Sequence, residues 1–212
     1  SYQRNNFKNI KLLIENGADT NVYDSNGKNP LYYLLSQKNN DEMITYLIEK
    51  NITLDLNSVS LSQAIRDDNK VLAKLIIEKA TDLNQKSILY SETDFCLRNI
   101  IDNDNEFIKN ISKTSMDLGY DKLAPIHIAI LKKDIELINL LIDKNIDLNS
   151  QTYLTYTPLI LSIYCGNDEV TKLLIEKNVN LNKSTKYFKT PLHYAKEVNN
   201  QAIIDLLLEK GA

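Results

Sequence analysis

Three prolines at equal intervals constrain the fold of this chain more than any other feature. Pro125, Pro158 and Pro191 follow one another at intervals of 33 residues. Each begins a short apolar run, and a second, longer apolar stretch follows that ends in Asp-Lys or Glu-Lys. A fixed period of roughly 20–50 residues is typical of repeat proteins, whose units bury their apolar faces against one another. Such an array presents a long surface, so the pattern favours binding over catalysis.

The best-preserved unit predicts two helices joined by a turn. A proline in the first turn of a helix loses no hydrogen bond, because the first N–H groups have no partner within the helix. Residues 135–142 are apolar on more than one face, which predicts a helix buried between neighbours on both sides. Asn145 is expected to close this helix in the left-handed conformation. Asp134, Glu136 and Asp168 are predicted at the starts of second helices, where the helix dipole favours carboxylates.

The same template places further copies along the chain. The third copy lacks the proline but has a sound second helix at Val71–Ile77. The fourth is the most degenerate, with Asp94–Leu97 and Phe107–Ile111 as its weak helices, so we expect the weakest stacking and the fastest amide exchange there. One domain is predicted over residues 1–212, with repeats at approximately 1–22 (incomplete), 24–56, 57–84, 87–118, 119–149, 152–182 and 185–212.

The repeated segments resemble the ankyrin repeat family over nearly the whole chain. The resemblance rests on Thr190-Pro191-Leu192-His193-Tyr194-Ala195, Ala124-Pro125-Ile126-His127-Ile128-Ala129, Thr157-Pro158-Leu159, and Asp24-Ser25-Asn26-Gly27 before Pro30. It implies an all-α fold, a solenoid of stacked helix-turn-helix units with short hairpin loops and a concave groove. The hairpin glycine survives only as Gly27; at its place in later copies stand Lys122, Thr155 and Phe188.

The residues that carry most enzyme and metal chemistry are sparse. His127 and His193 are the only histidines and lie two repeats apart, too far to share a metal; the resemblance implies that they hydrogen-bond neighbouring loops instead. Cys96 and Cys165 are also two repeats apart and are predicted to be reduced thiols. Zinc-ligand spacing and Gly-rich phosphate loops do not occur. We therefore predict no enzyme activity, no cofactor and no metal.

Charge and hydropathy narrow the partner classes. The net charge is −3 without a block of Lys or Arg, which argues against nucleic acid. An uninterrupted run of about 18 apolar residues is absent, which argues against membrane insertion. We expect a monomer in an intracellular, cytoplasmic location, or in a host cytoplasm if the source is a pathogen. The chain begins just before a second helix and stops at the close of a repeat, so we expect part of a longer protein.

An asparagine recurs at the end of the copies, as Asn21, Asn84, Asn149 and Asn182. One interpretation is a turn residue that hydrogen-bonds its own backbone. The other is implied only by the resemblance, since asparagines at this place in ankyrin repeats are substrates of an asparaginyl hydroxylase.

Aromatic residues give the best functional signal. Tyr46 and Tyr194 are predicted to pack in the core. The candidate partner-binding residues are Tyr120, Leu123, Leu131, Tyr153, Leu154, Tyr156, Tyr164, Tyr187 and Phe188. Side by side in a stack they would form one apolar, aromatic stripe, and Tyr is enriched in interface hot spots. The alternative, which does not exclude the first, is that they pack hairpin on hairpin in place of the lost glycines.

Three functions are compatible with these patterns. The first is a non-catalytic protein-binding ankyrin array, a scaffold or adaptor that holds a partner protein in its groove and at its hairpin tips. The second is the recognition arm of a larger enzyme, effector or channel. The third is a structural spacer, against which the aromatic stripe argues. For the first, alanine at Tyr156 and Tyr187 should abolish partner binding and leave the melting curve nearly unchanged; the packing alternative predicts the reverse.

Overall fold

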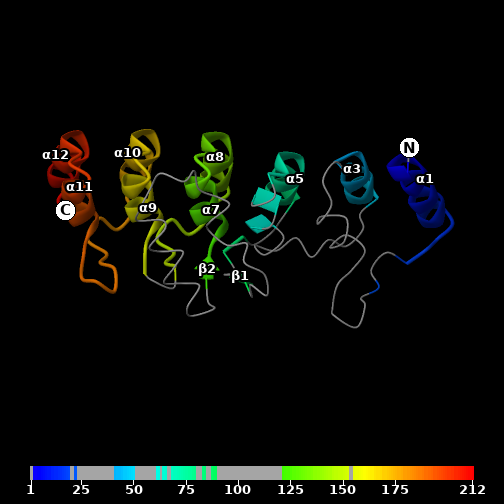
Figure 1. Ribbon diagram of the computed structural model, residues 1–212, viewed down its shortest axis with the longest axis horizontal. Helices are drawn as coiled ribbons and strands as arrows, with labels where there is room; N and C mark the ends of the chain where they lie inside the picture. Colours follow the sequence, from blue (N-terminus) through cyan, green and yellow to red (C-terminus); the bar gives the residue numbers. More distant parts are fainter. Residues whose placement is uncertain are drawn as a thin grey trace.

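Helices follow one another in a single elongated row, and the loops that connect successive pairs leave from one side of it (Figure 1). The row is seen in a computed structural model. The structure describes residues 2–19, 22, 41–50, 61–62, 64–65, 68–79, 83–84, 87–89, 121–152 and 155–212. The arrangement is the stacked helical solenoid that the repeat pattern predicts.

Three helix pairs form the C-terminal part of the row. A proline lies in the first turn of each first helix, as the spacing predicts. Asn145 has a φ of 54° and closes its helix in the left-handed conformation, and Asn178 and Gly211 do the same in the following copies. The pairs are α7 (Pro125–Leu131) with α8 (Ile135–Asp143), α9 (Pro158–Tyr164) with α10 (Asp168–Glu176), and α11 (Pro191–Glu197) with α12 (Gln201–Glu209).

The N-terminal part contains α1 (Tyr2–Glu15), α3 (Asp41–Glu49) and α5 (Lys70–Lys79). The predicted second helix of the third copy, Val71–Ile77, lies within α5, so that prediction is confirmed. Phe7 of α1 meets Tyr46 of α3 edge to face, with ring centroids 6.1 Å apart. Tyr46 therefore packs between neighbouring helices, as predicted.

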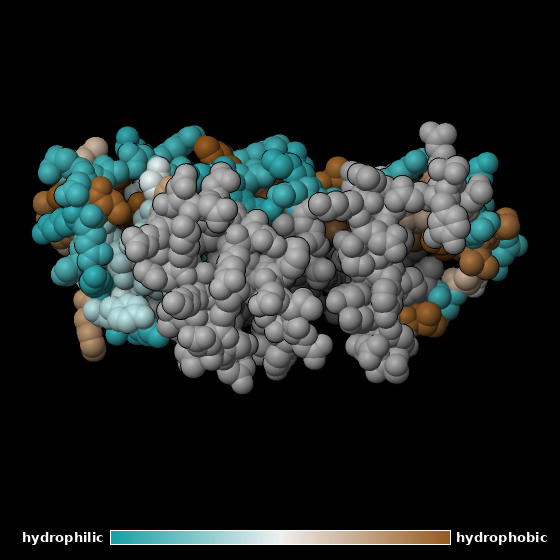
Figure 2. Space-filling view, viewed as in Figure 1, coloured by the Kyte–Doolittle hydropathy of each residue, from teal (hydrophilic) through white to brown (hydrophobic). Residues whose placement is uncertain are grey.

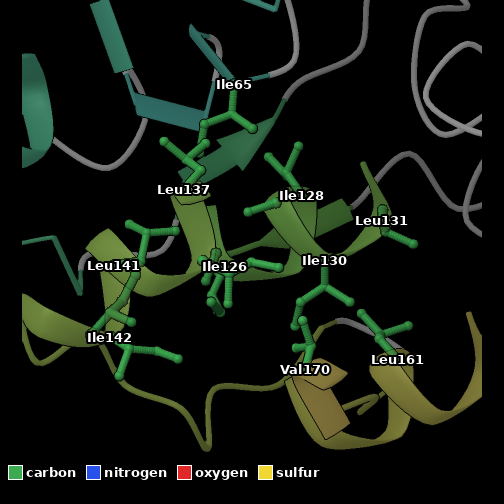
Figure 3. Packing of buried hydrophobic residues seen from close by; sticks show 14 of the residues in the cluster. Ile65, Ile126, Ile128, Ile130, Leu131, Leu137, Leu141, Ile142, Leu161 and Val170 are labelled. Atoms are coloured by element: carbon green, nitrogen blue, oxygen red, sulfur yellow. The ribbon is translucent and has the colours of Figure 1, made fainter. Parts of the chain in front are cut away.

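The core runs through the row between successive copies. Figure 3 shows α7 and α8 in the middle of it, with Leu137 next to Ile65 on one side and Ile130 next to Leu161 and Val170 on the other. These five side chains are at most 3% exposed. Full burial of such a side chain contributes roughly 1.5–3 kcal/mol, so the stability of each copy depends on both of its neighbours.

The third and fifth predicted copies touch each other directly. Helix α5 packs on α8, and no other described element lies between them (Figure 1). Three ion pairs between described residues join the copies. The Lys70 ammonium lies 2.7 Å from the Asp134 carboxylate, the Lys74 ammonium lies 2.6 Å from that of Glu136, and Lys132 pairs with Asp68. The prediction of a fourth unit, residues 87–118, stacked between them is therefore corrected. Its predicted helices, and Cys96, lie outside the described residues.

The extra residues enter the array within a hairpin. Strands β1 (Ser87–Leu89) and β2 (Asp121–Leu123) pair in antiparallel register and are an addition to the all-helical expectation. The pair of Ser87 with Leu123 occupies the place at which two later hairpins begin. In those hairpins the Thr152 N–H donates to the Tyr156 carbonyl at 3.0 Å, and the Thr185 N–H donates to the Lys189 carbonyl at 2.9 Å. Three residues separate the partners in the later hairpins. Residues 88–122 separate them here.

The length of this insertion explains why the 33-residue period predicted a fourth stacked unit. Asn149 precedes Pro158 by nine residues, whereas Asn84 precedes Pro125 by 41. The difference of 32 is one residue short of the repeat period. An insertion of that length keeps the spacing of a complete repeat, and contacts such as those between α5 and α8 reveal that the two copies are neighbours.

Candidate partner-binding surface

The structure buries several residues that were expected to form one exposed stripe. Leu123, Leu131 and Tyr156 are 5%, 7% and 3% exposed and belong to the hydrophobic core. Side chains this deeply buried cannot offer contact area to a partner, so their place in an exposed stripe is corrected. Tyr120, Tyr153 and Leu154 lie outside the described residues.

Tyr156 instead forms an aromatic cluster that joins the sixth and seventh copies. Its ring centroid lies 5.8 Å from that of Tyr194, and the Tyr164 ring lies 5.7 Å from Tyr194 on another side. Burial, followed by a hydrogen bond with Tyr194, raises the pKa of the Tyr156 phenol above its ordinary value. Tyr194 is 2% exposed and packs in the core, as predicted. For Tyr156 the packing alternative therefore holds, while Tyr164 is partly exposed at the edge of this cluster.

Two predicted residues stand out from the surface together. Tyr187 is 50% exposed and Phe188 is 86% exposed. They occupy the turn of the last hairpin, between Lys177 and α11, which projects away from the helices (Figure 1). The Phe188 N–H donates to the Thr185 carbonyl at 2.9 Å, and Phe188 has a φ of 58°. Backbone hydrogen bonds thus hold the ring of Phe188 in water.

Contacts with the preceding hairpin fix this turn. The Lys186 N–H donates to the Thr155 hydroxyl oxygen at 2.5 Å. Its ammonium lies 5.3 Å from the centre of the Tyr187 ring, within the range of a cation–π contact. Lys189 forms an ion pair with Glu197, and the hydrogen bond in that pair raises the pKa of the Lys189 ammonium. The exposed aromatic pair, Tyr187 with Phe188, is therefore presented by an ordered hairpin.

The two histidines are parts of the repeat. His127 is fully buried; the Ala124 N–H donates to its Nδ1 at 3.0 Å, so its Nε2 carries the proton and donates to the Ser150 carbonyl at 3.2 Å. His127 therefore bridges two neighbouring loops, as the resemblance implied. His193 is exposed and bonds within its own turn, with its Nδ1 2.8 Å from the Thr190 hydroxyl oxygen. Over the described residues, His, Cys, Asp and Glu do not gather into a group that could hold a metal ion.

The recurring asparagines link successive copies. The Asn149 amide oxygen accepts from the Asn180 N–H at 2.8 Å, and that of Asn84 accepts from the Asp147 N–H at 2.6 Å. Within the turn, the acceptor is the side chain of the residue two positions earlier. The Asp147 carboxylate accepts from the Asn149 N–H at 2.9 Å. For Asn149 and Asn182, whose side chains bond Asn180 and Gly211 of the next copy, the expectation that they bond their own backbone is corrected; Asn21 lies outside the described residues. The signal that sequence reasoning missed was the Asp or Asn that precedes each of them by two residues.

Carboxylates at the starts of second helices act both within and between copies. Asp134 caps α8 by accepting from the Leu137 N–H at 3.2 Å, and Glu136 and Asp168 lie in first turns, as predicted. Burial alone would raise the pKa of Asp134, but the hydrogen bonds from Lys70 and Leu137 and the lysine charges lower it below its ordinary value. The predicted helix-dipole role is joined by an ion pair across the interface.

Cys165 is a free thiol at the end of α9. Burial raises its pKa to about 11, an effect that the charge of Lys133 only partly offsets. The thiolate is the reactive form of cysteine, so this residue is poorly suited to nucleophilic chemistry at neutral pH.

Among the helices that the structure describes, none has the length and apolar character needed to cross a membrane.

Comparison with known proteins agrees with this architecture. The family model described as ankyrin repeats (three copies) matches residues 1–87 and 126–212, and it leaves out nearly all of the insertion. The chain is similar to a protein of fowlpox virus (strain NVSL) named as an ankyrin repeat protein, with 29% identity over 163 residues, 74% of this chain and 29% of the relative.

A second similar protein, from Acanthamoeba polyphaga mimivirus, is also named as an ankyrin repeat protein; the identity is 29% over 97 residues, 45% of this chain and 30% of the relative. The chain thus spans less than a third of the length of each of these curated relatives. The family match covers far more than half of the chain, and its boundaries fall where the helix pairs stack. The chain belongs to the ankyrin repeat family.

Proposed function

We propose that this chain is a non-catalytic protein-binding module that docks a partner protein at the hairpin edge of its last two copies. Ankyrin repeats generally mediate protein–protein interactions, and proteins of the family are typically non-enzymatic. The observation that carries the proposal is the exposed aromatic pair, above all Phe188, which is 86% exposed and left-handed. Tyr164, partly exposed one copy away, would extend the contact into the groove.

Phe188 is unfavourable for the isolated chain in two independent ways. A residue with a side chain in the left-handed conformation costs roughly 1–2 kcal/mol relative to glycine, and the exposed ring leaves a large apolar area in water. Strained residues persist where function requires them, and aromatic side chains dominate interface hot spots. Burial of the ring against a partner would offset both costs. A packing role in the free chain would not offset them, because the ring stays exposed there.

Partner and location follow from the same proposal. The module acts as a monomer that binds another protein and no nucleic acid, in the cytoplasm of its own cell or of a host. A second candidate is that it forms the recognition arm of a larger enzyme, effector or channel. That candidate is favoured by the relatives, of whose length this chain covers only 29% and 30%.

Site-specific cross-linking tests the docking surface. The chain is prepared with p-benzoylphenylalanine at position 188, irradiated in a lysate of cells that contain the natural protein, and compared with the same label at Leu208. Leu208 is 53% exposed on α12 and serves as the matched control. We expect a cross-linked protein at position 188 that is absent at position 208.

The captured protein must also depend on the aromatic side chains. In a pulldown, the pair Tyr187→Ser and Phe188→Gly should lower its recovery at least tenfold, while Leu208→Gln leaves the recovery unchanged. Equal recovery with the hairpin variant and the wild type would refute docking at this edge. Far-UV circular dichroism of each variant verifies that the array remains folded.

A further inference from the structure

Charge is distributed unevenly around the exposed aromatic pair. Residues 178–196 contain four lysines and no carboxylate, although the chain as a whole carries a net charge of −3. The corresponding segment of the preceding copy, residues 145–163, contains one carboxylate, that of Asp147, and no lysine or arginine. Apart from Glu197 at the end of α11, the carboxylates of the last two copies lie in the second helices, at the opposite side of the array from the hairpin tips (Figure 1). The hairpin edge is therefore a basic surface on an acidic chain.

The lysines flank the aromatic pair directly. Lys186 precedes it and lies over the Tyr187 ring, with its ammonium 5.3 Å from the ring centre. Lys189 follows it and is neutralised by Glu197, the first carboxylate beyond this segment. The Lys183 ammonium donates to the Asn149 carbonyl at 2.9 Å, and that carbonyl carries no formal charge to balance it. The ammonium group of Lys186 thus lies at an aromatic pair whose Phe188 ring stands in water.

The surrounding surface does not share this character. Figure 2 shows that the edge of α8, α10 and α12 away from the hairpins is largely hydrophilic, with scattered apolar groups. The charged residues of those helices are mainly acidic, and Lys172 of α10 is the one basic residue among the three helices. In the described surface of the last two copies, an exposed apolar side chain next to basic residues is found at the final hairpin.

We propose that the segment recognised at this hairpin is an acidic peptide of the partner protein, with an apolar side chain that covers Phe188 and a carboxylate that meets Lys186. This inference rests on the proposed function. Opposite charge steers the encounter and selects among partners, while the buried apolar contact supplies most of the affinity.

The same chemistry argues for a peptide over a nucleic acid. Surfaces that bind single strands combine a basic groove with a series of aromatic side chains on which successive bases stack. Here the aromatic residues are two neighbours in one turn, and one ring face of Tyr187 is already covered by Lys186. A single apolar anchor beside a few ammonium groups suits a short acidic motif.

Selection from a random library tests the inference without assuming a partner. A phage-displayed library of random dodecapeptides is selected on the full chain, with counter-selection on the Phe188→Gly variant. We expect the enriched peptides to be net negative and to contain an aromatic residue or leucine. The best peptide and its charge-reversed form, with Lys at every Asp and Glu, are then titrated by fluorescence anisotropy.

Matched variants separate the two parts of the contact. We expect Phe188→Gly to weaken binding of the acidic peptide at least tenfold without lowering the melting temperature. Lys186→Gln should weaken it several-fold and reduce its dependence on salt, because exposed charges are screened by ions. Lys172→Gln, an equal change of charge on exposed α10, should have no effect.

Four results would overturn the inference: no enriched peptide, enriched peptides that are neutral or basic, equal binding of the charge-reversed form, or tighter binding of the oligonucleotide dT15. Failure here differs from failure of the proposed function. If cross-linking at position 188 captures a protein but acidic peptides do not bind, the docking surface stands and the charge rule is wrong. If acidic peptides bind but no protein is captured, the recognition chemistry stands and the docking proposal is wrong.

Discussion

Removal of the insertion should leave the ankyrin array intact. The change replaces residues 88–122 by the turn Lys-Asn-Gly, which joins Ser87 to Leu123 at the length of the later hairpins. Glycine takes the third place because Thr155 and Phe188 have positive φ angles of 63° and 58° there. The shortened hairpin would then match those before α9 and α11.

The described contacts between the helices of the third and fifth copies lie outside the removed segment. They include the ion pairs of Lys70 with Asp134 and of Lys74 with Glu136, and the bond between Asn84 and Asp147 lies outside it too. We therefore expect the free energy of unfolding to change by less than about 1 kcal/mol. A stacked unit behaves differently, since folded domains gain about 0.05–0.15 kcal/mol per residue. Loss of one 33-residue copy should thus cost about 2–5 kcal/mol.

Urea unfolding followed by far-UV circular dichroism measures the difference. The matched control deletes residues 152–184, a complete copy that includes the buried Ile160, Val170, Leu174 and Ile175. The control should lose the full amount expected for a stacked copy. If the excision of residues 88–122 costs as much as the control, those residues contribute a stacked unit and the argument from the α5–α8 contact is refuted.

Four further predictions test single residues. Phe188→Gly should raise the free energy of unfolding by about 1 kcal/mol, because glycine adopts its backbone conformation without strain; a loss in urea unfolding would contradict this. Tyr156→Ala should cost about 3–5 kcal/mol by the same assay, since it empties a buried aromatic site, and an unchanged melting curve would restore it to the exposed stripe. Cys165, whose pKa is raised to about 11, should react with iodoacetamide at pH 8 about a hundredfold more slowly than the same chain in urea; equal rates would show an accessible thiolate. Asp134→Asn keeps the helix cap but removes the charge, so the wild type should be more stable by about 1 kcal/mol at pH 7. Because the folded pKa of Asp134 is lowered, this advantage is present above the ordinary carboxyl pKa and disappears as the pH falls through the folded value; an advantage that persists in acid would exclude the ion pair as its source.

Features set within one copy could be predicted from the sequence. Pro125 opens a helix and Asn145 closes one in the left-handed conformation, and each outcome follows from the backbone preferences of the residue itself. The two-sided apolar pattern of residues 135–142 likewise predicted a helix between two neighbours. These signals are local, so the predictions drawn from them do not depend on which copies are neighbours in the stack.

The identity of the neighbours is a different kind of information. Spacing counts residues along the chain, and an insertion of 32 residues mimics a repeat of 33. The pairing of Asn84 with Asp147 is the contact that reveals it, and the partners are 63 positions apart. A weak sequence signal did exist. Asn84 is followed by a hydroxyl residue three positions on, as Asn149 and Asn182 are, which marks the start of a hairpin and not of a new copy.

Burial within a hairpin also depends on position more than on residue type. Tyr156 immediately precedes the threonine that caps α9 and turns into the core, whereas Phe188 stands one position earlier in its own copy and turns outward. Both are aromatic, and the sequence assigned both to one surface. The left-handed backbone at Phe188 was the distinguishing feature, and a missing glycine was its only trace in the sequence.

The insertion and the aromatic pair together identify the face of the array that is open to change. Both lie in hairpins at equivalent places of the repeat, and neither disturbs the helix contacts on which the stack depends. A substitution such as Thr171, fully buried where the neighbouring copy has Ile138, needs a compensating bond to Ser162 at 2.9 Å. The side chain of Phe188, which is 86% exposed, is not held by core packing of this kind. A strained, exposed aromatic residue is therefore best explained by a contact that the free chain does not make.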